Sequence, residues 1–150
     1  MAADPALVEL LRESGDILVF SGAGISTGSG IADYRGPSGV RTTRRPVSYH
    51  EFMTAHAARD EYWDPHLETW PGMRDATPHP THHAAARMEE AGKVLMVVTQ
   101  NIDGLHRSAG LPDHAVVELH GNAHLAACIE CRGKVPTREA LKQCLAELQS

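Results

Sequence analysis

The strongest constraint on the fold is a short apolar run that leads directly into a glycine-rich loop. Residues 17–20 read Ile-Leu-Val-Phe, and a loop running from Gly22 to Gly39 follows at once. An unbroken run of strand-forming residues between turn residues predicts a strand that is buried on both faces, as in a parallel sheet. The fold must therefore cover this strand and leave an open loop at its carboxyl end.

Helices and further strands alternate around this run. A helix over residues 4–13 is predicted from its apolar spacing, with Asp4 as N-cap and Pro5 in the first turn. Residues 47–76 have weak helical patterning and predict short helices and loops. The other expected elements are helices over 81–91 and 137–148, a short helix or turn over 101–109, and strands over 94–98 and 115–119. This order is typical of an α/β fold.

Composition excludes several classes of protein. The chain has 150 residues and a formal net charge of −5, so we expect one domain and no direct binding to nucleic acid. No run approaches the ~20 apolar residues that span a bilayer, so we expect no membrane partner. The acidic N-terminus resembles neither a secretory signal nor a transit peptide, and a cytoplasmic protein is expected. The three cysteines are too few and too uneven for a disulfide framework.

Polar residues follow each of the three predicted strands. In open α/β sheets ligands bind at the carboxyl ends of the strands, so these three loops predict one site. The first loop contains Gly22, Ala23 and Gly24, where backbone N–H groups can approach a pyrophosphate. Thr27 stands where the usual dinucleotide fingerprint has a third glycine, and a tight turn without a ligand is the alternative.

The second and third loops carry the groups for chemistry. Gln100 and Asn101 offer amides suited to ribose hydroxyls or a carboxamide, and Asp103 can accept from an amide N–H. The alternative is that Asn101 or Asp103 only caps a helix. His120 follows the third strand and is placed to act as a base near neutral pH, although it is one of ten histidines that could equally pack or lie on the surface.

Taken together, these segments resemble the sirtuin (Sir2) family of NAD-dependent protein deacylases. The resemblance covers about residues 15–135. It rests on five motifs that occur in the same order along the chain. Those motifs are Gly22-Ala23-Gly24-Ile25-Ser26, Gly30-Ile31-Ala32-Asp33-Tyr34-Arg35, Thr99-Gln100-Asn101-Ile102-Asp103, Leu119-His120-Gly121 and Cys128-x-x-Cys131. Arg44-Arg45-Pro46, Tyr62-Trp63 and Trp70-Pro71 further resemble the class II branch.

The resemblance implies a role for each matching residue. Gly22, Ala23 and Gly24 would line the NAD phosphates, and Asp33, Tyr34 and Arg35 would belong to the cofactor loop. His120 would be the general base. Gln100 and Asn101 would bind the nicotinamide ribose, and Ile102 and Asp103 the carboxamide; Asn101 and Asp103 count with His120 as catalytic. The partner would be an acylated lysine of a protein substrate.

The resemblance also implies a division of the chain. A partial Rossmann-like parallel sheet would occupy about 1–40 and 77–122, a helical insertion about 41–76, and the start of a small zinc-ribbon module about 123–150. Cys128 and Cys131 have the spacing of half a structural Zn²⁺ site, which needs four ligands. A second pair is absent, and Cys144 fits an apolar helix residue better. The chain is therefore expected to be the N-terminal portion of a sirtuin, and to be poorly stable or inactive in isolation.

Three other functions remain open at this stage. The cofactor residues would equally serve a protein ADP-ribosyltransferase or an NAD hydrolase. A non-catalytic module that binds NAD or ADP-ribose is a further alternative, although a pure binder has no use for a base at His120. A thiol redox protein using Cys128 and Cys131 is the weakest, because that motif normally begins a helix after a strand.

Overall fold

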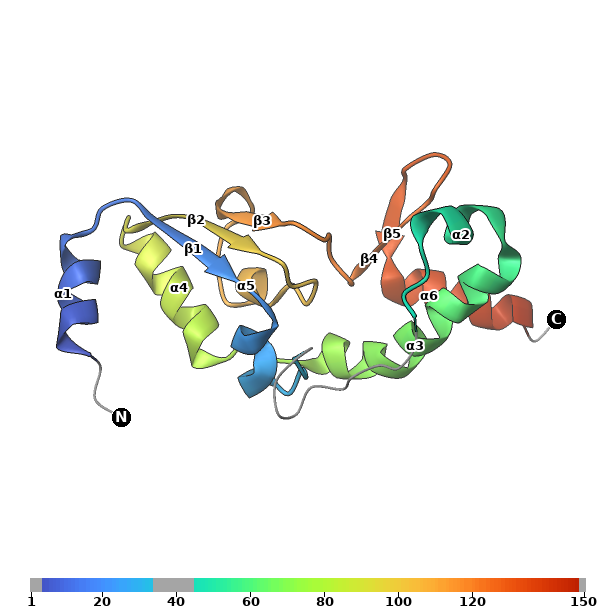
Figure 1. Cartoon of the computed structure of the whole chain (residues 1–150), viewed down its shortest axis with the longest axis horizontal. Helices are drawn as coiled ribbons and strands as arrows, with labels where there is room; N and C mark the ends of the chain where they lie inside the picture. Colours follow the sequence, from blue (N-terminus) through green and yellow to red (C-terminus); the bar gives the residue numbers. More distant parts are fainter. Residues whose placement is uncertain (1–3, 34–44, 149–150) are drawn as a thin grey trace.

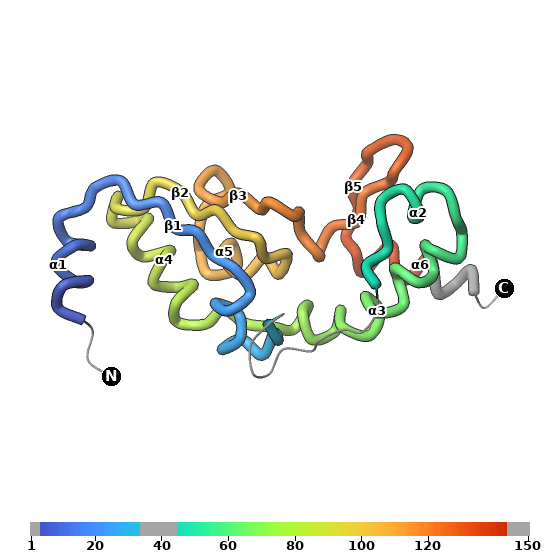
Figure 2. The backbone as a smooth tube through the Cα atoms, in the orientation of Figure 1, coloured from blue at the N-terminus to red at the C-terminus, as the bar shows by residue number. Residues whose placement is uncertain are grey.

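The computed structural model describes residues 4–33 and 45–148 (Figure 1). A three-stranded sheet with helices α1, α4 and α5 lies at one end of the molecule, and helices α2 and α6 with a small hairpin lie at the other. The long helix α3 runs between the two ends, and the tube in Figure 2 shows the same elongated arrangement.

The sheet is parallel and has the order β1-β2-β3, comprising β1 (Ile17–Ser21), β2 (Val94–Thr99) and β3 (Val116–Glu118). Val19 pairs with Val97, and Val97 with Val116, so these three valines share one face. Helix α4 (Pro80–Glu90) covers that face, and Ala85 joins the valines in the buried core. The predicted α/β fold and all three strands are confirmed.

The opposite face of the sheet is largely uncovered by the described residues. Leu18 is 61% exposed and Phe20 is 60% exposed, and Val117 on the neighbouring strand is also exposed. The prediction that the first strand is buried on both faces is therefore wrong for this structure. Side chains alternate across a strand, and among the described elements α4 covers only the face of Val19.

Helix α1 (Pro5–Glu13) begins as predicted. Asp4 is its N-cap, and the Asp4 carboxylate accepts a hydrogen bond of 2.9 Å from the Ala6 N–H. None of the α1 side chains is buried. The helix is fastened instead at its carboxyl end, where the Lys93 ammonium donates to the backbone carbonyls of Leu11, Arg12 and Ser14.

The helical insertion is more regular than the sequence predicted. It contains α2 (Tyr49–Thr54) and α3 (His56–Asp75), a continuous helix of 20 residues that contains Pro65 and Pro71. The prediction of short helices and loops is wrong for this segment. An aromatic cluster spans the two helices: the ring of Tyr62 lies 5.0 Å from that of Phe52 and 4.4 Å from that of His66. These contacts stabilise a helix that the apolar periodicity did not reveal.

The end of the described chain is a two-stranded antiparallel hairpin followed by a helix. The hairpin pairs β4 (Leu125–Ala127) with β5 (Lys134–Pro136), and α6 (Thr137–Leu148) follows with the predicted bounds. Short helical pieces fill the loops near the sheet: η1 (Ala23–Ser29), α5 (Leu105–Ser108) and η2 (Asp113–Ala115).

Candidate functional site

The three loops that follow the strands meet at one edge of the sheet, as predicted. The Gln100 N–H donates to the Ser21 carbonyl at 3.1 Å, and the Leu119 N–H donates to the Thr99 carbonyl at 2.9 Å. These bonds continue the parallel ladder just past the strand ends. The first loop is thereby joined to the second, and the second to the third.

The first loop turns directly from β1 into η1. Ala23 and Gly24 are the first residues of η1, and a Cβ added to Gly22 or Gly24 would meet no atom within 4 Å. The surface beside this backbone is therefore open. Asp33 lies at the far end of the loop, and its Oδ1 is buried without a hydrogen-bond partner among the described residues. Tyr34 and Arg35 lie outside the described residues.

The second loop is fixed to the first by side chains. The Asn101 amide Nδ2 donates to the Gly22 carbonyl and to the Ser26 hydroxyl, each at 3.1 Å. Ser26 in turn donates to the Asp103 carboxylate at 2.6 Å, and the other carboxylate oxygen of Asp103 accepts from the Leu105 N–H at 2.9 Å. Asp103 therefore accepts from the first N–H of α5, whose N-cap residue is Gly104, and it also binds the first loop. Gln100 is exposed at the edge of the site.

The third loop brings His120 beside the second loop. His120 is exposed, and it lines a cavity of about 260 Å³ together with Ile102. Apolar side chains from α3, the hairpin and α6 complete this cavity, among them Trp70 and Leu125. A base at His120 would therefore act beside a largely apolar hollow, on the loop that is hydrogen-bonded to the one carrying Asn101 and Asp103.

The third loop is held in place by further contacts with the second. The Ala123 N–H donates to the Ile102 carbonyl at 2.7 Å, and the His124 Nε2 donates to the Asp103 carbonyl at 2.8 Å. The His124 ring also meets the Trp70 ring edge-on, with centroids 5.1 Å apart. His124 thus links α3 to the loop that carries Asp103. Sequence reasoning did not assign it this role.

A second group that sequence reasoning missed lies directly beneath the loops. Ser21 and Thr99 are buried at the paired ends of β1 and β2, and His106 and His82 are buried behind them. The Ser21 hydroxyl lies 2.8 Å from the His106 Nε2 and donates to the Thr99 hydroxyl at 2.9 Å. In the sequence, this group is indicated only by Ser21 and Thr99, two hydroxyl residues that each end an apolar strand.

Burial keeps both of these histidines uncharged near neutral pH. It lowers the pKa of His106 to about 4, and a charge on His82 would lower it further, while Asp103 acts in the opposite direction. Burial likewise lowers the pKa of His82, again against the effect of Asp103. These groups therefore act as neutral hydrogen-bonding side chains in the folded protein.

Cys128 and Cys131 lie in the turn of the β4–β5 hairpin, and both are exposed. Backbone hydrogen bonds from Cys131 and Glu130 lower the pKa of the Cys128 thiol. Within residues 4–33 and 45–148, no three His, Cys, Asp or Glu side chains come together as a metal site. The side chain of Cys144 lies outside the described part of the structure.

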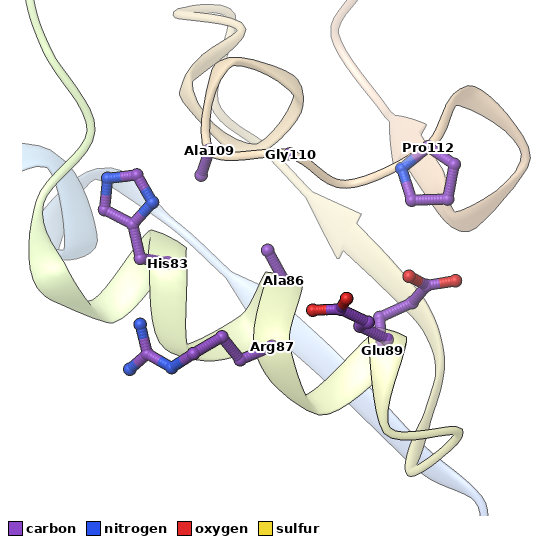
Figure 3. A pocket seen from close by; sticks show the side chains of 8 residues that line it. His83, Ala86, Arg87, Glu89, Ala109, Gly110 and Pro112 are labelled. Atoms are coloured by element: carbon purple, nitrogen blue, oxygen red, sulfur yellow. The ribbon is translucent and has the colours of Figure 1, made fainter.

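A second hollow, of about 460 Å³, lies between α4 and the turn after α5. In Figure 3, Ala86 on α4 points toward Ala109 and Gly110, with Arg87 and Glu89 along the same helix. None of the predicted site residues lines this hollow. It therefore lies apart from the strand-end loops.

None of the helices within residues 4–33 and 45–148 is both long enough and apolar enough to cross a membrane.

Comparison with known proteins places these features in a family context. A sequence model described as "Sir2 family" matches residues 22–149. An NAD-dependent protein deacetylase of Thermodesulfovibrio yellowstonii is 42% identical over 134 residues, which are 89% of this chain and 52% of the relative. NAD-dependent protein deacetylase 1 of Corynebacterium efficiens is 44% identical over 140 residues, which are 93% of this chain and 48% of the relative.

Solved structures give the same result. A structure described as a Sir2–p53 peptide–NAD⁺ complex superimposes with a TM-score of 0.80 at 34% identity, covering 93% of this chain and 55% of the other. A Sir2 variant with deacetylated p53 peptide and 3′-O-acetyl ADP-ribose gives a TM-score of 0.77 at 33% identity, covering 92% and 55%. The chain spans about half the length of the curated relatives it matches.

Proposed function

Because this chain belongs to the Sir2 family, we propose that it carries the nicotinamide-side site of an NAD-dependent protein lysine deacylase. The observation that carries the proposal is the meeting of His120, Ile102, Asn101 and Asp103 at one edge of the sheet, beside an apolar cavity. The names of the relatives and the contents of the Sir2 complexes support the same activity.

The residues at this edge suit NAD as the co-substrate. The open backbone beside Gly22, Ala23 and Gly24 can receive phosphates, and the unpartnered buried oxygen of Asp33 can accept a hydrogen bond from the ligand. We assign Tyr34 and Arg35 to the same cofactor loop from the sequence motif alone. NAD would supply the ADP-ribosyl group that accepts the acyl chain, and nicotinamide would leave.

The second loop would orient the sugar and the carboxamide. Both hydrogens of the Asn101 amide are used on the first loop, which leaves its carbonyl oxygen to accept from a ribose hydroxyl. We propose that Gln100 assists Asn101 at the ribose, and that Ile102 and Asp103 bind the carboxamide. Rigid placement of these groups would speed the transfer, because reactants that are already oriented avoid much of the entropy lost in bringing them together.

His120 would act as the general base. An imidazole can take a proton from a ribose hydroxyl near neutral pH and release it again. The cavity beside His120 would receive the acylated lysine of the protein substrate, and its apolar lining would exclude water from the reacting centre.

We further propose a structural Zn²⁺ on the hairpin, with Cys128 and Cys131 supplying two of its four ligands. Zinc binds the thiolate, and the lowered pKa of Cys128 favours that form. We propose that the chain has three parts. They are a Rossmann-like part (about 1–40 and 77–122), a helical insertion (about 41–76) and a zinc module (about 123–150). The class II branch and a cytoplasmic location remain predictions.

The test is product analysis. The intact protein that contains these residues is purified and incubated with NAD and an acyl-lysine peptide, and the masses of the products are measured. We expect free lysine peptide, nicotinamide and O-acyl-ADP-ribose, and we expect His120→Ala to reduce turnover by about 10²-fold or more while NAD still binds. His114→Ala, an exposed histidine away from the three loops, is the control.

The other outcomes separate the alternatives. Cleavage of NAD without loss of the acyl group, with or without transfer of ADP-ribose to protein, would favour an NAD hydrolase or ADP-ribosyltransferase. Binding of NAD by calorimetry with no products would favour a non-catalytic binding module. Either result would contradict the deacylase proposal for this chain.

A further inference from the structure

A chain of buried hydrogen bonds runs from behind the sheet to Asn101. It begins at the His106 Nε2, which lies 2.8 Å from the Ser21 hydroxyl, and continues from Ser21 to the Thr99 hydroxyl at 2.9 Å. Thr99 then accepts from the Asn101 backbone N–H at 3.1 Å. His106, Ser21 and Thr99 are all at least nine-tenths buried. The chain therefore connects α5 to the second loop through the ends of two strands.

The directions of these bonds define the proton on His106. Ser21 has a single hydroxyl hydrogen and donates it to Thr99. The His106 Nε2 must then donate to the Ser21 oxygen, so the imidazole carries its proton on Nε2. Its Nδ1 is buried without a hydrogen-bond partner among the described residues. His106 is thus a neutral donor aimed at one hydroxyl.

His82 completes the arrangement from α4. It is fully buried, and its ring meets the His106 ring edge-on with centroids 5.0 Å apart. Its Nδ1 accepts from the His79 N–H at 3.1 Å, so its proton lies on Nε2. His79 in turn packs on the first loop, because a Cβ added to Gly28 would lie 2.2 Å from the His79 ring. Helix α4 therefore supports both His106 and the first loop.

We propose that His106, backed by His82, is a positioning residue for Asn101: it donates to Ser21 and thereby fixes, through Thr99, the start of the loop that binds the ribose. Neither histidine is among the residues that we expect to touch the substrates. The part of this inference that concerns the ribose rests on the proposed function. The hydrogen-bonded link from His106 to Asn101 does not.

Packing alone would not explain why a hydrogen-bond donor stands at His106 beside the buried Ser21 hydroxyl. An apolar side chain at His106 would fill the space but leave the buried Ser21 oxygen without its donor, which is costly in a dry interior. A glutamine places an N–H donor at a similar reach to the imidazole Nε2. The proposal therefore predicts that the donor, and not the ring, is what the site needs.

The test uses matched variants of the whole chain and NMR of the protein without NAD. The backbone amide resonances of Asn101, whose N–H donates to Thr99, and their rate of hydrogen exchange report this link directly. We expect His106→Leu and Ser21→Ala to shift these resonances and to raise the exchange rate about tenfold, as expected for loss of one hydrogen bond. We expect His106→Gln and Ser21→Thr, which keep the donor and the hydroxyl, to restore them. His83→Gln, on the exposed side of α4, is the control.

Calorimetry of NAD binding gives the second measurement. We expect His106→Leu and Ser21→Ala to bind NAD about tenfold more weakly than the wild type, and the two rescuing variants to bind within about twofold of it. Asn101 resonances that are unchanged in Ser21→Ala and His106→Leu would overturn the inference, whether or not NAD binds. Failure of the wild type to bind NAD, with the expected Asn101 shifts present, would overturn the proposed function and leave the link established.

Discussion

At the scale of single residues, the site depends on buried polar side chains that hydrogen-bond to one another. Ser26 is 1% exposed and Asp103 is 5% exposed, yet the two share a hydrogen bond of 2.6 Å. A buried carboxylate is tolerated because it accepts from both Ser26 and the Leu105 N–H. Asp103 therefore holds the first and second loops together, and it is also the residue proposed to bind the nicotinamide carboxamide.

The buried histidine pair predicts that stability depends on pH. The pKa of His106 in the folded protein is about 4, below its ordinary value of 6.5, so the unfolded chain binds the proton more tightly. The stability that the neutral, buried His106 contributes to the folded protein is fully present above pH 6.5 and is lost as the pH falls toward 4. We expect the wild type to lose about 2 kcal/mol more unfolding free energy than His106→Gln between pH 7.5 and 5, measured by urea denaturation.

The lowered pKa of His82 acts in the same direction in both proteins, so the difference between them reports His106 together with its coupling to His82. His83→Gln, which removes an exposed histidine, should show the wild-type pH dependence. An equal loss of stability in the wild type and His106→Gln would contradict the assignment of a neutral, buried His106.

The sequence located some of these residues but not others. Asn101, Asp103 and His120 were found because they follow predicted strands, and residues at strand ends of a parallel sheet come together. His106 and His82 could not be distinguished among ten histidines, because their importance comes from burial against each other and against Ser21. Burial of that kind is a property of the packed structure.

At the scale of elements, the Lys93 side chain joins α1 to the sheet. Helix α1 buries none of its residues, and the Lys93 ammonium accounts for three hydrogen bonds to its carboxyl end. Cations are favourable at this end of a helix, where carbonyl groups lack partners. Lys93 immediately precedes β2, and its carbonyl accepts from the Ile17 N–H at 2.9 Å.

We therefore expect Lys93→Met to release α1 while the rest of the fold persists. Amide hydrogen exchange followed by mass spectrometry should show at least a tenfold loss of protection in residues 5–13, because about 1–3 kcal/mol of helix-end bonding is lost. Lys142→Met, at an exposed lysine on α6, is the control. Unchanged protection of α1 in Lys93→Met would show that other contacts retain the helix.

Helix α3 illustrates where prediction from patterns fails. Its two prolines and its mixed polarity left only a weak helical pattern, yet it is continuous over His56–Asp75. Proline removes one backbone donor and disfavours a helix interior, so local preference opposes this element. The packing of Tyr62 against Phe52 and His66 supplies stabilisation that periodicity does not record.

At the scale of the whole molecule, the described part of the sheet has one covered face and one open face. Leu18 and Phe20 are about three-fifths exposed, side by side on that open face. Apolar patches of this kind favour association. We expect the 150-residue chain to self-associate, with a weight-average sedimentation coefficient that rises with concentration.

The double substitution Leu18→Thr, Phe20→Thr should weaken this association at least tenfold, because burial of each side chain contributes about 1.5–3 kcal/mol. Leu125→Thr, at an exposed leucine on the hairpin, is the matched control and should associate like the wild type. A wild-type chain that stays monomeric over the same concentrations would contradict the prediction.

The sequence by itself determined the α/β order, the three strands and the loops that follow them. It did so because strand and helix periodicities are local, and because the ends of parallel strands must share an edge. Only the tertiary structure decided which face of the sheet is covered, that residues 56–75 form one helix, and that His106 and His82 stand behind Asn101. Those facts depend on contacts between residues far apart in the chain, such as Ser21 with Thr99 and His106.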